Sequence, residues 1–101
     1  MNSLAALAEP TRARVIEAVA ERPRTVNDLV ELLGVSQPGM SKHLRVLREA
    51  GLVRVQPAGQ TRVYHLDPAP LKELDRWMDR YRRFWSSKLD ALEAHMDEEP
   101  E

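Results

Sequence analysis

Hydrogen-bond donors and cations are concentrated between residues 36 and 62. This segment holds five basic residues and one acidic residue, a net charge of +4, although the whole chain of 101 residues has a net charge of -1. Exposed amide, hydroxyl, ammonium and guanidinium groups pair with phosphate oxygens and base edges. The charge alone fits either a solvated face or a surface that binds double-stranded DNA, and the helix pattern described below favours DNA. The candidate contact residues are Ser36, Gln37, Pro38, Ser41, Lys42, His43, Arg45, Arg48, Arg54, Gln60, Thr61 and Arg62.

No pattern in the chain indicates catalysis or metal binding. The sequence has no cysteine, which excludes disulfides, thiolate metal ligands and thiol redox chemistry. It has no phosphate-binding or dinucleotide-binding glycine motif and no Ser/His/Asp set. His95 lies beside acidic residues, but one histidine does not supply the three or four ligands of a metal site. We therefore expect no enzyme, no catalytic residue, no cofactor and no metal.

Two helices and a short turn must position the basic segment. Thr25 and Asp28 have the spacing of a helix-capping box. Gly34 suits the left-handed backbone that ends a helix. Between these signals, apolar residues at helical spacing predict a buried side formed by Val26, Leu29, Val30 and Leu33.

The second helix is predicted over residues 37–50, with Ser36 as its N-cap and Gly51 as its end. At about 100° per residue, its apolar side and its polar-basic side are opposite each other. The apolar side is formed by Met40, Leu44 and Leu47. Two helices of this kind joined by a tight turn form a helix-turn-helix unit.

The flanking segments add helices before this unit and a hairpin after it. A short first helix near residues 4–8 is followed by a second, which begins at Pro10 and ends near residues 21–23. After Gly51, residues 52–55 and 61–66 are predicted as strands around the turn residues 57–60. A hairpin directly after the polar-basic helix is a wing, here residues 54–64. The predicted fold is mostly α with a small β-hairpin, a winged helix-turn-helix of order α-α-α-α-β-β-α.

The last helix is predicted to begin at Asp67-Pro68 and to run to about Met96. Its apolar stripe is too wide for one small core to cover. It can be a single buried face, but we prefer a face shared between its own domain and a second copy of the chain. The expected homodimer interface comprises Leu4, Leu7, Leu74, Trp77, Met78, Tyr81, Phe84, Trp85, Leu89 and Leu92.

The chain is expected to be one domain over residues 1–97, with a frayed acidic tail at 98–101. No apolar run approaches the roughly 18 to 20 residues that cross a bilayer. No export signal is present at the start of the sequence. We therefore expect a cytoplasmic protein with no membrane partner.

The DNA contacts divide by position. In the first turns of the 37–50 helix, Gln37, Pro38, Ser41 and Lys42 point outward and can meet base edges. Arg45 and Arg48 are expected to hold phosphates, and Arg54 to support its strand or touch a phosphate. His43 flanks the buried side and is expected to be structural, with a possible phosphate contact. At the wing, Gln60, Thr61 and Arg62 are placed to enter a minor groove.

Four segments in order resemble the ArsR/SmtB family of bacterial winged-helix repressors. They are residues 7–12 (LAEPTR), 35–44 (VSQPGMSKHL), 47–53 (LREAGLV) and 63–66 (VYHL). The resemblance covers about residues 4–75. It implies a homodimer built from the first and last helices, binding to an inverted-repeat operator, and release from DNA by a ligand.

One departure from the family concerns that ligand. Founding members of the family sense metals through cysteines on the helix-turn-helix or through Asp/His sets on the last helix. The positions that would carry the cysteines hold Asp28, Val30 and Leu32-Leu33 here. The resemblance therefore implies a repressor without thiol-based arsenic or cadmium sensing, whose inducer is unknown. The alternative function is a winged-helix protein-interaction module that does not bind DNA, which the +4 segment disfavours.

Overall fold

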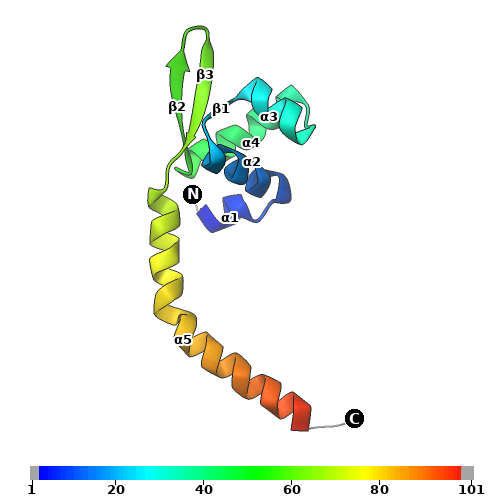
Figure 1. Cartoon of the computed structure of the whole chain (residues 1–101), viewed down its shortest axis with the longest axis vertical. Coiled ribbons are helices and arrows are strands. Elements are labelled where there is room, and N and C mark those ends of the chain that lie inside the picture. The colour runs from blue at the N-terminus through cyan, green and yellow to red at the C-terminus, as the bar shows by residue number, and fades with distance from the viewer. Residues whose placement is uncertain (1–2, 99–101) are drawn as a thin grey trace. The chain divides into compact units, whose positions relative to one another are not determined.

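The structure, a computed structural model, describes residues 3–98, except for the side chain of Glu98. The element order is α1 (Ser3–Leu7), α2 (Pro10–Glu21), β1 (Arg24–Thr25), α3 (Val26–Leu33), α4 (Gln37–Glu49), β2 (Val53–Ala58), β3 (Thr61–Leu66) and α5 (Ala69–Glu98) (Figure 1). The predicted fold class, mostly α with a small β-hairpin after a helix-turn-helix, is confirmed. The expected dimer is not tested by one chain.

The chain divides into two compact units between Leu71 and Lys72. The first contains α1 to α4 and the sheet, and the second contains most of α5. The single domain expected over residues 1–97 stays a prediction. Glu98, assigned to the tail from the sequence, is the last residue of α5, and residues 99–101 lie outside the described residues.

The core of the first unit is built by α1 to α4 and by the parts of β2 and β3 away from the hairpin turn. Leu29, Leu44 and Leu47 are among the side chains with almost no exposure. The expectation that α3 buries four apolar residues is wrong in extent. Only Leu29 is fully buried, because α3 packs on the core from one side; the others lie at the rim and are Val26, Val30 and Leu33.

Local hydrogen bonds fix the helix ends where the sequence predicts them. Thr25 and Asp28 form a complete capping box at α3, with both bonds present. Gly34 ends α3 in the left-handed region at φ 70°. Ser36 caps α4, its Oγ accepting the N–H of Gly39 at 3.2 Å. These caps fix the residues at which α3 ends and α4 starts.

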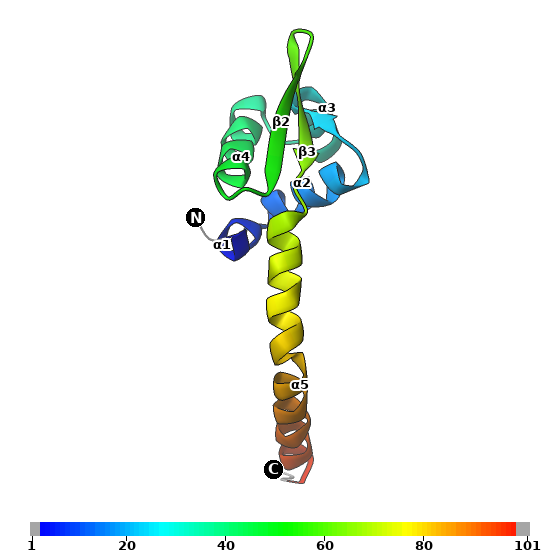
Figure 2. The same cartoon turned by 90° about the vertical axis from the view of Figure 1, so that its left-hand side faces the viewer.

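The sheet has three strands in the order β1-β3-β2, all antiparallel (Figure 2). The short strand β1 was not predicted; Arg24 pairs with Tyr64 and Thr25 with Val63. β2 also runs longer than predicted, so that Pro57 and Ala58 belong to the strand and only Gly59 and Gln60 form the turn. Pro57 is tolerated because β2 is an edge strand.

α5 comprises 30 residues. It begins one residue later than predicted, at Ala69, whose N–H donates to Oδ1 of Asp67 at 3.1 Å. It also extends beyond the predicted end at Met96. No helix in the described range is long and apolar enough to cross a membrane.

Candidate nucleic-acid interface

α4 separates its side chains into two faces. Met40, Leu44 and Leu47 are buried against the core, with at most 1% exposure. The opposite face is exposed and carries the predicted contact residues of this helix, Gln37, Pro38, Ser41, Lys42, Arg45 and Arg48. Four of these predicted residues line one shallow depression, here called the helix depression: Pro38, Ser41, Lys42 and Arg45. The structure therefore brings an ammonium, a guanidinium and a hydroxyl together on an outward surface.

A second hollow joins the start of α4 to the wing. This wing depression is lined by Thr25, Val26, Asn27, Gln37, Gln60, Thr61 and Arg62. It unites Gln37 of α4 with all three residues predicted at the wing. Sequence reasoning missed Asn27. The start of α3 lies beside the wing because β1 pairs with β3, and the sequence did not predict that pairing.

Two of the predicted contact residues already make local hydrogen bonds. The Ser36 hydroxyl oxygen accepts a bond as the cap of α4. The Thr61 hydroxyl donates to the carbonyl of Ala58 at 2.8 Å and thereby holds the turn of the wing. The other polar candidates of the two depressions are exposed, and their donor groups face solvent: Gln37, Ser41, Lys42, Arg45, Gln60 and Arg62.

Four predicted contact residues lie outside both depressions: the N-cap Ser36, described above, and His43, Arg48 and Arg54. Arg48 and Arg54 are exposed, near the end of α4 and on β2. His43 is half-buried, and its Nδ1 lies 3.7 Å from Oε2 of Glu9. This contact joins α4 to the start of α2 and agrees with the structural role expected for His43.

Glu9 is also the N-cap of α2. Its carboxylate accepts the backbone N–H of Arg12 at 2.8 Å, and this bond lowers the pKa of Glu9 below its ordinary value. The guanidinium Nε of Arg12 donates to the carbonyl of Ala6 at 2.7 Å. The helices α4, α2 and α1 are therefore linked by one chain of polar contacts.

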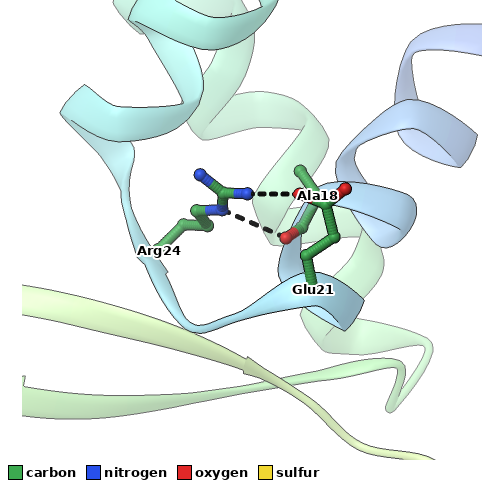
Figure 3. Close-up of polar contacts among 3 residues, drawn as sticks. All are labelled: Ala18, Glu21 and Arg24. Carbon is green, nitrogen blue, oxygen red and sulfur yellow. Dashed lines mark hydrogen bonds and ion pairs between the residues drawn. The ribbon is translucent and has the colours of Figure 1, made fainter.

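Arg24 of β1, the strand that pairs with β3 of the wing, is bonded to α2 (Figure 3). It is 8% exposed; its Nε donates to the carbonyl of Ala18 at 3.1 Å and its Nη2 lies 2.8 Å from Oε1 of Glu21. A buried guanidinium needs such partners, because an unpaired charge away from water is costly. Arg24 belongs to β1, which pairs with β3, so these contacts position the strand that carries Arg62.

The residues predicted for a dimer interface differ between the chain's two units. In the first, Leu4 is 56% exposed, whereas Leu7 packs against the core. On α5 most of the predicted residues are about half exposed, with Trp77 at 52% and Trp85 at 56%. These side chains form an apolar groove along the helix, lined by Trp77, Met78, Tyr81, Arg82, Trp85, Ser86 and Leu89.

Aromatic contacts organise this groove. The rings of Trp77 and Tyr81 lie 5.0 Å apart, and Phe84 meets Trp85 edge to face at 5.3 Å. The ammonium of Lys88 lies 5.4 Å from the centre of the Phe84 ring.

Over the residues that the structure describes, no three His, Asp or Glu side chains lie close enough to hold a metal ion. The expected absence of a metal and of a cofactor stays a prediction.

Comparison with known proteins identifies relatives of this architecture. The family described as bacterial regulatory protein, arsR family, matches residues 9–55. The HTH-type transcriptional regulator Rv2034 of Mycobacterium tuberculosis is 43% identical over 93% of this chain and 85% of its own length. The arsenic resistance transcriptional regulator ArsR1 of Pseudomonas putida is 38% identical over 94% of this chain and 77% of its own.

A solved structure extends the likeness to three dimensions. A crystal structure described as a possible transcriptional regulator for arsenical resistance has a TM-score of 0.77 and 40% identity, covering 94% of this chain and 96% of that one. The two relatives named above are transcriptional regulators rather than enzymes. They favour DNA binding over the alternative of a winged-helix module that contacts only proteins.

Proposed function

The chain belongs to the ArsR family of bacterial regulatory proteins and is a DNA-binding transcriptional regulator, and we propose that it is a homodimeric repressor of an inverted-repeat operator. The single observation that carries this mode of binding is the division of α4 into a buried apolar face and an exposed polar and basic face. The exposed face of α4 carries Lys42, Arg45 and Arg48 against one acidic residue, Glu49 in the last turn, so the part that would meet base edges bears neutral and positive groups.

The recognition helix over residues 37–50 enters the major groove. That groove is about 12 Å wide and admits one α-helix, whose first turns read base edges. Gln37 can bond both edges of an adenine, and Lys42 can donate to guanine acceptors. Arg45 and Arg48 lie further along the helix and hold phosphates.

The wing over residues 54–64 meets the neighbouring minor groove. Arg62 and Gln60 lie at its tip, and an arginine is drawn to the negative potential of a narrow minor groove. The wing depression supports this arrangement because it places the tip beside Gln37, the first residue of α4.

Two copies of the chain associate through the apolar face of α5, together with Leu4 and Leu7 of α1. About half of each large side chain on that face is exposed in one chain, an aggregation hazard unless a partner covers it. A two-fold symmetric dimer presents two recognition helices, and such a pair requires two half-sites in inverted order.

The chain does not sense arsenic or cadmium through thiolates. It contains no cysteine, and soft metal ions select thiolate ligands. The relatives whose names mention arsenic therefore do not supply the inducer of this protein.

The test begins with DNA fragments selected by the purified protein from a random library, whose sequencing gives the operator. We expect the Arg45→Ala, Arg62→Ala double variant to remain folded and to lose most of its operator affinity. The slope of log affinity against log salt concentration should fall by about two, one for each cationic contact to DNA that is lost.

The matched control is Arg14→Ala, Arg22→Ala, which removes the same charge from α2 and its C-cap, outside both depressions. It should bind almost as the parent protein does. Gel-shift titrations at several salt concentrations measure both variants, and equal affinity of the two would overturn the proposed contacts.

A further inference from the structure

We infer that Asn27, at the start of α3, contacts DNA and that it holds one backbone phosphate of the operator jointly with Arg62 in the wing depression. The inference rests on the DNA-binding mode proposed above. It adds a contact from outside the recognition helix and the wing.

The position of Asn27 follows from the sheet. Thr25 pairs with Val63 of β3, so the first turn of α3 lies beside the strand that begins with Thr61 and Arg62. Asn27 is exposed in that turn and lines the same hollow as Arg62. Its side-chain amide forms no hydrogen bond with any other residue between 3 and 98, so its donors are available.

The hollow is lined by donors without any acid. Asn27, Gln37 and Gln60 contribute amides, and Arg62 contributes a guanidinium. The other face of α3 differs: the depression there is lined by Arg22 and Arg24 together with Asp28 and Glu31. A third depression, between α2 and α3, is lined by Arg14 together with Glu17 and Glu21.

This contrast identifies the chemistry of the ligand. Where arginines face carboxylates, their charge is neutralised within the protein. In the wing depression every lining residue other than Arg62 is uncharged, and amide N–H groups and a guanidinium are the donors that proteins direct to phosphate oxygens.

The place of the hollow distinguishes a phosphate from a base. In duplex DNA the sugar-phosphate strand separates the major groove from the minor groove. A surface between a helix in the major groove and a wing in the minor groove therefore faces that strand. Asn27 lies on this surface, since Gln37 and Arg62 line the hollow with it.

Two variants test the contact. Asn27→Ala removes the donor and should weaken binding about ten-fold, the value of one hydrogen bond to a charged group. Asn27→Asp places a negative charge against the phosphate and should weaken binding further. An acidic residue in the first turn favours a helix, so any loss of binding by Asn27→Asp does not arise from unfolding of α3.

Competition gel shifts with operator DNA and random DNA distinguish a phosphate contact from a base contact. Both variants should lose affinity for the two DNAs by the same factor, because a phosphate carries no sequence. Asn27→Ala should leave the salt slope unchanged, whereas Arg62→Ala should lower it by about one. The loss in the Asn27→Ala, Arg62→Ala double variant should be smaller than the two single losses combined, because both groups hold one phosphate.

Arg14→Gln is the control for Asn27→Asp, since it makes the same change in net charge on α2. Unchanged binding by Asn27→Ala overturns the contact. A loss confined to the operator also overturns it, because Asn27 would then read a base. If Arg45→Ala, Arg62→Ala binds normally, the proposed mode of DNA binding fails, and that outcome is separate from a failure at Asn27 alone.

Discussion

The chain before Lys72 buries most of its large apolar side chains, whereas the helix after Lys72 leaves them exposed. Before Lys72 the large apolar side chains of α2, α4 and the sheet are buried in a shared core. Beyond it, α5 leaves two tryptophans, a tyrosine and a phenylalanine about half exposed. The first unit buries a core of its own, whereas the exposed α5 surface is the one that we propose to be covered by a second copy. On that proposal, folding and assembly depend on separate segments.

The largest expected effect is a difference in stability between Leu44→Ala and Leu89→Ala. Leu44 is 1% exposed, and its truncation should lower the free energy of unfolding by about 2 to 5 kcal/mol through lost burial and a cavity. Leu89 is 59% exposed, and at a dilution where the protein is monomeric its truncation should cost much less. Urea unfolding of dilute protein measures both. Equal losses would show that α5 is covered within its own chain.

A smaller effect is expected on association. Trp85→Ala should weaken the dimer about thirty-fold, as truncation of a buried aromatic at an interface does. Sedimentation equilibrium gives the dissociation constant, and Asp90→Ala, an exposed polar change on the same helix, is the control. A parent protein that sediments as a monomer at micromolar concentration would contradict the shared face.

The smallest effect concerns acid and belongs to the first unit. The Thr25 N–H lowers the pKa of Asp28 below its ordinary value of 3.8, and the Arg12 N–H lowers that of Glu9 below 4.5. Because the folded values are the lower ones, both carboxylates stabilise the fold above their ordinary pKa values. That stabilisation is lost as the pH falls through the folded values.

Asp28→Asn should therefore flatten the fall in melting temperature between pH 5 and pH 2 by a small amount. Glu31→Gln on the same helix is the control, since Glu31 makes no contact with the capping box. An identical acid profile for Asp28→Asn and the parent would exclude the capping box as a source of acid sensitivity.

The sequence was sufficient wherever a structure depends on neighbouring residues. The capping box of Thr25 and Asp28, the left-handed Gly34 and the N-cap Ser36 depend on side chains within a few positions, and all are confirmed. The two faces of α4 follow from helical periodicity alone. The predicted contact residues stay predictions, but the structure places eight of the twelve in two exposed depressions.

The parts that were missed depend on contacts between distant segments. β1 is two residues long, too short to show an alternating pattern, and it exists because Tyr64 and Val63 lie opposite it. Arg24 looks like an exposed arginine in the sequence and is buried only because Ala18 and Glu21 accept its donors. The role inferred for Asn27 depends on both, since without β1 nothing places it beside the wing.

The short length of β1 has a consequence for which operators can be bound. β3 has a neighbour on each side at Val63 and Tyr64, but only β2 accompanies it at Arg62 and Thr61. A two-stranded ribbon is marginally stable alone, so the tip bends more easily than the base on which it stands. Minor-groove width varies with base composition. On the binding mode proposed above, a tip that bends beyond a fixed base lets Arg62 reach grooves of different width while α4 keeps its place. The operator sequence beneath the wing can then vary without loss of binding.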